Sequence, residues 1–529
     1  MKSFLSSIFF LICFRATAQL PYEQIYLQTD QPEYYIAGET VWFKAYLYSP
    51  FINTHYSTTL YTEILDEELN PVVSGKFLVD GGISIGQLKL PVNLPQGPYL
   101  LRAYTAWSLN FGEHNIYKKG LMVFNPITAP AVEKHSGELM CSFYPESGKI
   151  IYELQNLIAF RISESEFKKQ SYRGAVIDKD GKELFRVSTD SMGRGQFNIQ
   201  PGKGNEYRLR IQVPGKDQQT YFPFPAMEET GLLLHAEDRD NDKSFRISRL
   251  DTSNHDYDRL LLQGVMYNRN VFQMDIDMKG EKELSGALKT DLLPTGILQL
   301  LLIDNDNNII SQRNILIDHN DEVPVNAMTD TFSLKRGSMN VIGMDFPDSL
   351  SGNFSISVTA IANDTINKWN ENIIDGLFLQ PGNKELQTGF EQDLTSIEKD
   401  LVAVTSYRDA VIPTNEEKFK ETPYIRIRGS IGMPLDKIKT IPTEITFIVQ
   451  TKDSTQTAIS TAVSPSGTFE LNDLVFSDTA QFFYQFKAAK PLAKQLPVKL
   501  EKDSSYQFLS HVQAGGCAKK KDHKNIDLA

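Results

Sequence analysis

The stretch QIYLQTDQPEYYIAGETVWFKAYLY, residues 24–48, reads as two strands joined by a turn. Ile25 and Leu27 alternate with polar or tyrosine neighbours before the turn, which is marked by Pro32 and Gly38. After the turn, apolar residues again occupy every second position: Val41, Phe43, Ala45 and Leu47. Alternation of period two, bounded by proline and glycine, predicts a sheet with one buried face.

The same stretch resembles the second macroglobulin-type domain (MG2) of the alpha-2-macroglobulin family. Residues 29–34 (TDQPEY) match its "TD-x-P-x-Y" segment, and residues 38–41 (GETV) follow as in that domain. Residues 94–102 (LPQGPYLLR) look like its "L-P-x-G-x-Y" return strand. Domains of this kind are binding and spacing modules, so the resemblance implies binding rather than chemistry.

A second segment, residues 141–148 (CSFYPESG), resembles the third macroglobulin domain. It is also similar to the "F-Y-P-E-G-G" strand of bacterial envelope relatives, with Ser147 in place of a glycine. Longer relatives continue into a plug domain of TonB-dependent receptors, whereas a polar tail is expected here. The family's thioester segment, C-G-E-Q, is absent around Cys141 and Cys517, so the protease-trapping mechanism is not carried over.

A chain of 529 residues is too long for one core. Turn signals recur about every ten residues, which is typical of sandwiches. We therefore predict an all-β fold, a tandem array of immunoglobulin-like or macroglobulin-type β-sandwich domains, with one short helical insertion near residues 394–408. The predicted parts are a signal peptide (1–19), an MG2-like sandwich (20–125), a linker (126–138), an MG3-like sandwich (139–228), a sandwich (229–321), a sandwich with the helical segment (322–415), a carboxypeptidase-regulatory-like sandwich (416–500) and a polar tail (501–529).

The N-terminus predicts export. Lys2 precedes an apolar run, and an Ala-Thr-Ala site at residues 16–18 fits signal-peptide cleavage. Cys13 leaves a lipoprotein as the alternative. No later stretch is apolar and long enough to predict a transmembrane span. The formal net charge of −12 argues against nucleic acid as a partner, because phosphate binding needs clustered Lys and Arg.

Several motifs suggest chemistry that their context does not support. Residues 82–86 (GISIG) match the G-x-S-x-G nucleophile elbow, but a second strand, rather than a helix, is predicted to follow Ser84. Residues 237–242 place carboxylates at alternate positions, but they lack the glycine and distal glutamate of a calcium loop, so a loop between strands is favoured. Residues 304–308 (DNDNN) lie between two apolar runs, so a hairpin turn is favoured there. The histidines lack metal-site spacing. They are His55, His114, His135, His235, His255, His319, His511 and His523.

We therefore predict no catalytic residue, no cofactor and no metal site. The leading hypothesis is a non-enzymatic, exported binding or scaffold protein of the bacterial cell envelope. It would make protein–protein contacts in an outer-membrane-associated complex, in the periplasm or at the cell surface. The first alternative is an accessory component of TonB-dependent uptake that lacks its plug domain. The second is a surface carbohydrate-binding accessory protein.

Aromatic residues of the first module give the candidate binding site. Tyr34 and Tyr35 are adjacent, and two successive side chains of a pleated strand cannot both point inward. Exposed aromatic residues are enriched at binding sites. We therefore predict that Tyr34, Tyr35 and Trp42 contribute to a surface that binds an envelope or outer-membrane protein. The alternative is the ordinary rim of a sandwich.

Overall fold

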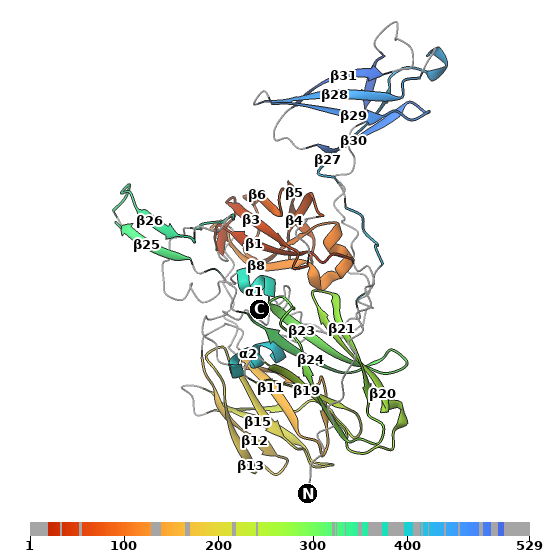
Figure 1. The fold of residues 1–529 in the computed structure, drawn as a ribbon. Helices are drawn as coiled ribbons and strands as arrows, with labels where there is room; N and C mark the ends of the chain where they lie inside the picture. Colours follow the sequence, from red (N-terminus) through yellow and green to blue (C-terminus); the bar gives the residue numbers. More distant parts are fainter. Residues whose placement is uncertain are drawn as a thin grey trace. The chain divides into compact units, whose positions relative to one another are not determined.

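The computed structural model divides the chain into two compact units (Figure 1). Unit 1 comprises Met1–Tyr22, Ala131–Asn415 and Ala529; unit 2 comprises Glu23–Pro130 and Glu416–Leu528. The structure describes residues 20–31, 34–51, 56–127, 139–163, 170–213, 218–239, 242–319, 323, 325–333, 335–347, 352–357, 373–378, 396–405, 413, 416–421, 423–438, 441–452, 455–474, 480–487 and 496–501. The predicted signal peptide, residues 128–138 of the linker and most of the polar tail lie outside these residues.

The first sandwich of unit 2 packs a three-stranded sheet, β1-β3-β6, against a five-stranded sheet, β2-β8-β7-β4-β5. Phe43 and Phe77 meet edge to face between the sheets, with ring centroids 4.9 Å apart. The strands are β1 (Gln24–Thr29), β2 (Tyr34–Ile36), β3 (Thr40–Tyr48), β4 (Thr59–Leu65), β5 (Pro71–Leu78), β6 (Ile83–Lys89), β7 (Gly97–Tyr104) and β8 (Tyr117–Phe124).

Strand β3 confirms the alternation read from the sequence. Its buried side chains are Val41, Phe43, Ala45 and Leu47, and Trp42 points away from them. Each outward neighbour stays at least partly accessible because successive side chains leave a strand on opposite faces. The glycine turn before β3 has Gly38 at φ +90°, a conformation that residues with a Cβ adopt only with strain.

The second sandwich, in unit 1, contains the sheets β14-β11-β9 and β13-β12-β15-β16. Its core joins both sheets through buried residues such as Ile158, Phe160, Val176 and Leu209. A parallel pair, β10 and β17, lies beside them. The strands are β9 (Met140–Pro145), β10 (Ile150–Ile151), β11 (Asn156–Ser163), β12 (Arg173–Asp178), β13 (Glu183–Ser188), β14 (Arg194–Ile199), β15 (Tyr207–Gln212), β16 (Gln219–Pro223) and β17 (Met227–Glu228).

The third pair of sheets, also in unit 1, has the orders β18-β19-β22 and β21-β20-β23-β24. Strand β23 is buried along almost its whole length, as expected of a strand covered on both faces. The strands are β18 (Leu233–Arg239), β19 (Asp242–Ser248), β20 (Arg259–Met266), β21 (Arg269–Asp277), β22 (Glu283–Leu288), β23 (Gly296–Ile303) and β24 (Ile309–Ile317).

Between residues 322 and 415 the described residues form one hairpin and two helices. The hairpin pairs β25 (Asn326–Thr331) with β26 (Val341–Asp345), and the helices are α1 (Ile373–Phe378) and α2 (Ser396–Thr405). Helix α2 confirms the predicted insertion, whereas α1 was not predicted. Residues 352–357 belong to no strand, and the side chains of Phe354 and Ile356 are exposed.

The last sandwich, in unit 2, packs β30-β27-β32 against β29-β28-β31 around Ile445, Phe447, Phe469 and Leu471. Its strands are β27 (Ile425–Ile431), β28 (Glu444–Thr451), β29 (Gln456–Ala462), β30 (Thr468–Leu474), β31 (Ala480–Lys487) and β32 (Val498–Leu500). The predicted fold class, tandem immunoglobulin-like sandwiches with few helices, is therefore confirmed. The exact module boundaries stay a prediction.

Candidate functional site

The turn between β1 and β3 is organised by the carboxylate of Asp30. Its Oδ1 accepts hydrogen bonds from the hydroxyl of Tyr35 (2.8 Å) and from the backbone amide of Trp42 (3.1 Å). Glu39 Oε2 accepts the amide of Ile36 at 2.7 Å. The residues that carry the macroglobulin resemblance therefore fix the local path of the chain through side-chain caps on backbone donors.

Tyr35 belongs to the interior of the first sandwich. Its side chain is only 1% exposed, and its hydroxyl also accepts the amide of Gln31 at 3.3 Å. Burial, together with the neighbouring Asp30 charge, raises the pKa of this hydroxyl above its ordinary value. The prediction that Tyr35 contributes to a partner surface is corrected accordingly, because β2 directs it inward between two outward-facing neighbours.

Tyr34 and its neighbours form an exposed group that we call the aromatic edge: Tyr34, Ile36 and Phe124. The rings of Tyr34 and Phe124 stack at 5.8 Å with 26° between their planes. Ile36 pairs with Phe124 in the parallel β2–β8 register, and the three side chains are 38–47% exposed. Trp42, 54% exposed, lies on the other sheet of the sandwich. Two of the three predicted residues, Tyr34 and Trp42, are thus accessible to a partner.

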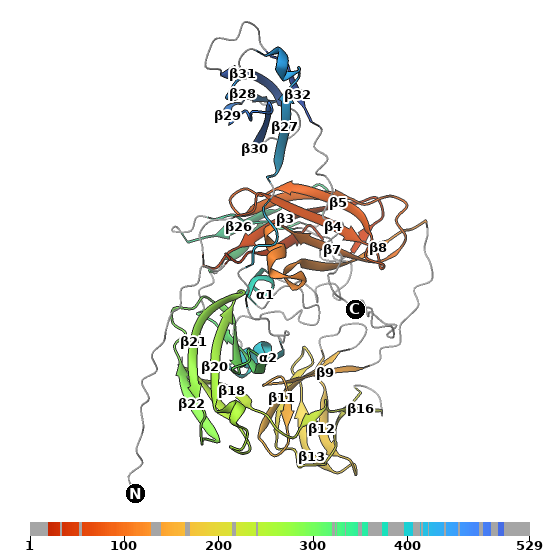
Figure 2. The same cartoon turned by 90° about the vertical axis from the view of Figure 1, so that its right-hand side faces the viewer.

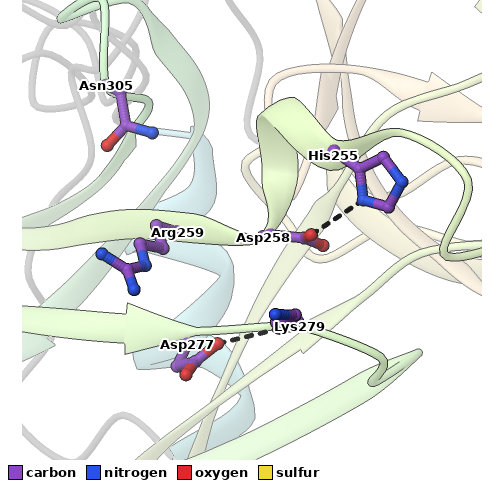
Figure 3. Close-up of a pocket in the computed structure, with 6 residues that line it drawn as sticks. All are labelled: His255, Asp258, Arg259, Asp277, Lys279 and Asn305. Atoms are coloured by element: carbon purple, nitrogen blue, oxygen red, sulfur yellow. Dashed lines mark hydrogen bonds and ion pairs between the residues drawn. The ribbon is translucent and has the colours of Figure 1, made fainter.

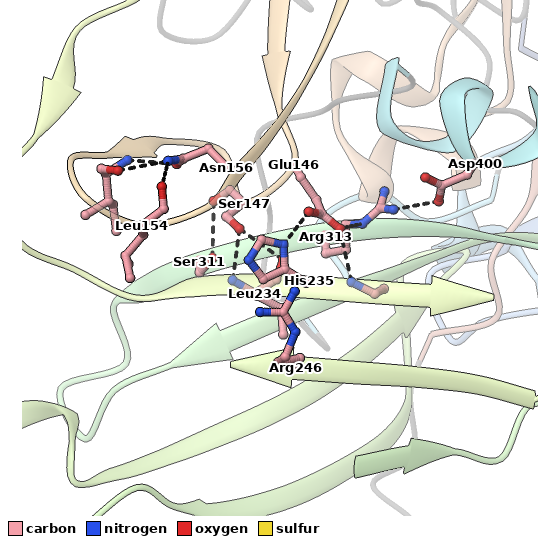
Figure 4. Close-up of polar contacts among 12 residues, drawn as sticks. Glu146, Ser147, Leu154, Asn156, Leu234, His235, Arg246, Ser311, Arg313 and Asp400 are labelled. Carbon is pink, nitrogen blue, oxygen red and sulfur yellow. Dashed lines mark hydrogen bonds and ion pairs between the residues drawn. The ribbon is translucent and has the colours of Figure 1, made fainter. Parts of the chain in front are cut away.

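A buried network of charges forms a second site, inside unit 1 (Figure 4). Glu146, in the turn after β9, is almost completely buried. Its Oε1 accepts the Nε of Arg313 (2.8 Å) and the amide of Ala236 (3.1 Å), and its Oε2 lies 2.5 Å from Nδ1 of His235. One carboxylate from the second sandwich is therefore held by three groups of the third.

Arg313 extends this network to helix α2. Its guanidinium is fully buried and bonds Asp400 Oδ1 at 2.6 Å and the carbonyl of Asn314 at 2.8 Å. Helix α2 also packs Leu401 and Val404 against Tyr144 and Ala159 of the second sandwich. Its Val402 and Ala403 pack against Ile297 and Leu316 of the third. The helix is therefore buried on opposite faces. It lies against β11 and β24 (Figure 1), and Figure 2 shows it beside β11 from a second side.

Ser147 adds a neutral clasp beside the charges. Its hydroxyl donates to the carbonyl of Leu234 (3.0 Å) and accepts the amide of the same residue (2.9 Å). Its carbonyl accepts the hydroxyl of Ser311 at 3.2 Å. The hydroxyl and carbonyl of Ser147 therefore add specific bonds between the second and third sandwiches.

Electrostatics favour the ionised form of Glu146. Burial alone would raise the pKa of this carboxyl, but the Arg313 charge and the bonds from His235 and Ala236 outweigh it and hold the pKa below its ordinary value. We call Glu146, His235, Arg313 and Asp400 the charge hub. Sequence reasoning missed it, although an arginine in the otherwise buried run of β24 was a usable signal.

A polar hollow of about 260 Å³ opens on the third pair of sheets (Figure 3). Its lining residues are His255, Asp258, Arg259, Asp277, Lys279 and Asn305. His255 Nδ1 is 2.9 Å from Asp258 Oδ2, and this bond together with Arg249 lowers the pKa of Asp258. Small-molecule sites are mostly lined by apolar side chains, and this hollow is lined by charged and polar ones.

The serine motif, the aspartate-rich turn and the cysteine considered in the sequence all have structural roles in the fold. Ser84 lies in β6 opposite Ala45 and is 1% exposed, so it does not occupy a strand-to-helix elbow. The Asp304 carboxylate accepts the amides of Asp306 and Asn308, which makes residues 304–308 the hairpin turn that was predicted. Cys141 is a free thiol whose pKa is raised by burial.

In the part of the chain that the structure describes, no three His, Cys, Asp or Glu side chains are grouped as metal ligands. Within the same residues, no helix combines the length and apolar character needed to cross a bilayer. Cys517 and the histidines of the tail lie outside these residues.

No protein-family model and no curated protein matches the chain. Among solved structures, Salmonella alpha-2-macroglobulin (mutant Y1175G) is 10% identical over 63% of this chain and 25% of its own, with a TM-score of 0.17. Escherichia coli alpha-2-macroglobulin activated by porcine elastase is 12% identical over 58% and 32%, with a TM-score of 0.21. A tetra-tandem repeat from the extending region of a large adhesion protein is 10% identical over 88% and 99%, with a TM-score of 0.15.

The chain thus spans about a quarter of the length of the Salmonella macroglobulin. At TM-scores this low the likenesses carry no argument about what the chain does. The MG2 assignment and the relation to TonB-linked proteins stay predictions.

Proposed function

We propose that this chain is a non-enzymatic, exported binding and scaffold protein of the bacterial cell envelope. It would act through protein–protein contacts in an outer-membrane-associated complex. The observation that carries the proposal is the aromatic edge, with Trp42 exposed on the same sandwich. Export rests on the signal-peptide pattern of residues 1–19.

The chemistry of the aromatic edge suits a protein partner. The stacked rings of Tyr34 and Phe124 hold each other in place, so little side-chain freedom remains to be lost on binding. A tyrosine offers both apolar area and a hydroxyl, and aromatic residues of this kind dominate binding energy at interfaces. The interior of the sandwich is already filled by residues such as Tyr35, so binding at this surface does not require unfolding.

The charge hub supports the scaffold part of the proposal. Interfaces between domains of one chain are by default loose and allow relative motion. Here a fully buried arginine, a helix packed on two faces and the Ser147 clasp connect the second and third sandwiches. Such a connection holds two domains in one arrangement, which is what a spacing module requires.

A site-specific cross-link tests the proposed binding surface. A photoreactive phenylalanine analogue replaces Tyr34 or Trp42 in the full-length chain, which is expressed in bacteria and irradiated in intact cells. We expect a discrete cross-linked species in the envelope fraction from both positions, because both side chains are accessible.

Tyr221 is the matched control, since it is an exposed aromatic residue (48%) on β16 of the second sandwich. The same analogue at Tyr221 should give no such species. Equal cross-linking from all three positions, or none from Tyr34 and Trp42, would reject the aromatic edge as the binding surface.

A further inference from the structure

A short segment of unit 2, residues 416–421, lies on the first sandwich although hundreds of residues separate them in sequence. We call it the strap. The side chain of Asn110 accepts the amides of Lys418 and Phe419, each at 2.8 Å, and donates to the carbonyl of Phe419 at 2.8 Å. Phe419 packs against Tyr61, Tyr104, Leu109 and Ile116.

The strap also inserts a carboxyl group. Glu421 Oε1 accepts the amides of Thr58 (2.9 Å) and Thr59 (3.2 Å). The preceding residue, Ser57, donates its hydroxyl to Glu23 Oε1 at 2.8 Å, and Thr105 donates to the same oxygen at 2.6 Å. Three consecutive residues leading into β4, Ser57, Thr58 and Thr59, therefore hold two neighbouring carboxyl groups.

Each of these carboxyl groups keeps one oxygen without a partner. Glu23 Oε2 and Glu421 Oε2 are buried, and neither makes a hydrogen bond to any described residue. Buried polar atoms normally have partners, and two neighbouring carboxylates that are both ionised repel each other. Protonation of one carboxyl removes one of the two charges, and its O–H can donate to the other carboxyl.

We infer that residues 416–421 are a pH-dependent strap, docked on the first sandwich while the Glu23–Glu421 carboxyl pair is protonated and released when both groups are ionised. The proton comes from and returns to solvent, and no covalent bond changes. The device lies apart from the aromatic edge and does not depend on the proposed function.

The groups around the carboxyl pair favour its protonated form in the docked state. Burial, followed by repulsion from Glu23, raises the pKa of Glu421 from 4.5 to about 7, against the lowering effect of the Thr58 and Thr59 amides. Burial also raises the pKa of Glu23. Residues 57–59 and 105 and the Trp107 backbone contribute only hydroxyl and amide donors to the pair. Lys76 reaches the carbonyl of Pro423 (3.5 Å), and Arg102 is bound by Glu63.

The coupling between proton binding and docking gives the sign of the pH dependence. A pKa that is higher in the docked state means that docking is strongest below the undocked value of 4.5 and weakens as pH rises towards about 7. Between about pH 5.5 and about pH 8.5 the docking equilibrium should fall on the order of 30-fold.

Hydrogen exchange of the full-length mature chain, followed by mass spectrometry, measures this equilibrium. Protection of the peptides that contain Thr58 and Thr59 and of the strap should fall by that factor over the same pH range, after correction for intrinsic exchange rates. Peptides from β28, in the core of the last sandwich, serve as the internal control.

Glu421→Gln is the decisive variant, because its neutral amide oxygen still accepts the Thr58 and Thr59 amides. Its strap should stay protected at every pH. Glu23→Gln should reduce the pH-dependent fall in exchange protection, because it removes the repelling charge. Phe419→Ala should leave the strap unprotected at every pH, because the strap then lacks its apolar anchor.

Three results would overturn the inference. The first is wild-type protection that does not change, or that rises, with pH. The second is an unchanged pH dependence in Glu421→Gln. The third is recovery of protection at the alkaline end on adding about 1 mM Ca²⁺, which would make a cation rather than a proton the ligand of the pair. The wild-type pH series tests the inference even if a variant does not fold.

Discussion

At the residue scale, single polar atoms decide which aromatic residues face outward. Asp30 Oδ1 accepts hydrogen bonds from the hydroxyl of Tyr35 and from the amide of Trp42. It therefore holds the buried Tyr35 ring close to the first residues of β3. Tyr34, one position earlier, then faces solvent and stacks on Phe124. The motif that resembles the macroglobulin domain therefore contributes structure through Tyr35 and a surface through Tyr34.

This arrangement predicts different effects at two tyrosines. Tyr35→Phe removes a buried hydroxyl and leaves Asp30 and the Gln31 amide each without one partner. We expect it to lower the free energy of unfolding by about 1–2 kcal/mol. Tyr221→Phe, which removes an exposed hydroxyl bonded to Gln219, should change it by less than about 0.5 kcal/mol.

Thermal or denaturant unfolding of the two variants beside the wild type gives the comparison. Equal stability of all three proteins would mean that the Tyr35 hydroxyl is replaceable in the interior.

At the scale of elements, helix α2 packs between the second and third sandwiches and contacts both of them. The helix has only ten residues, so its intrinsic helical preference is weak and tertiary packing must stabilise it. It obtains that packing from both neighbours, through Leu401 and Val404 on one side and Val402 and Ala403 on the other. Asp400 then bonds Arg313, which couples the position of the helix to the charge hub.

Removing the arginine tests this coupling. Arg313→Met leaves Glu146 as a buried carboxylate without its main counter-charge, and we expect unit 1 to lose about 3–5 kcal/mol of stability. Arg246→Met is the matched control in the third pair of sheets. Its ion pair with Glu283 is long (3.8 Å) and partly exposed, so its loss should cost less than about 1 kcal/mol.

Hydrogen exchange of α2 and β24 distinguishes a local effect from a global one. Similar behaviour of the two arginine variants would contradict the central position of Arg313.

At the scale of the whole molecule, the two units carry buried carboxyl groups of opposite electrostatic character. Glu146 in unit 1 has a cation beside it, and its pKa is lowered. Glu421 in unit 2 has another carboxyl group beside it, and its pKa is raised to about 7. Acidification therefore acts on the two units with opposite signs.

We expect each unit to respond in its own pH range. The Glu146 contribution is present above the unfolded value of 4.5 and is lost as pH falls below it. The strap instead gains stability as pH falls from about 7 towards 4.5. Exchange of the Leu234 and Ala236 amides reports on the hub, and exchange of the Thr58 amide reports on the strap.

In the Glu146→Gln variant, the loss of exchange protection that acid causes at the Leu234 amide should become smaller. The pH dependence of exchange at the Thr58 amide, which reports on the strap, should stay unchanged. Changes of the same sign in both units over the same pH range would refute this assignment of the two groups.

The sequence by itself determined the alternation of strand β3, helix α2 and the sandwich class. The alternation of Val41, Phe43 and Ala45 is local, since side chains leave a strand on alternate faces whatever lies beyond it. The helical spacing in residues 394–408 is local in the same sense, and α2 forms within it. These features need no knowledge of which surfaces later meet.

Only the tertiary structure decided which polar groups become partners. Arg313 finds Glu146 167 positions away, and Glu421 finds Thr58 363 positions away. It also decided that Tyr35 points inward while Tyr34 remains on the surface. The physical reason is that the charge state of a buried group depends on its neighbours in space and on its removal from water. Neither is encoded in the residues beside it in the chain.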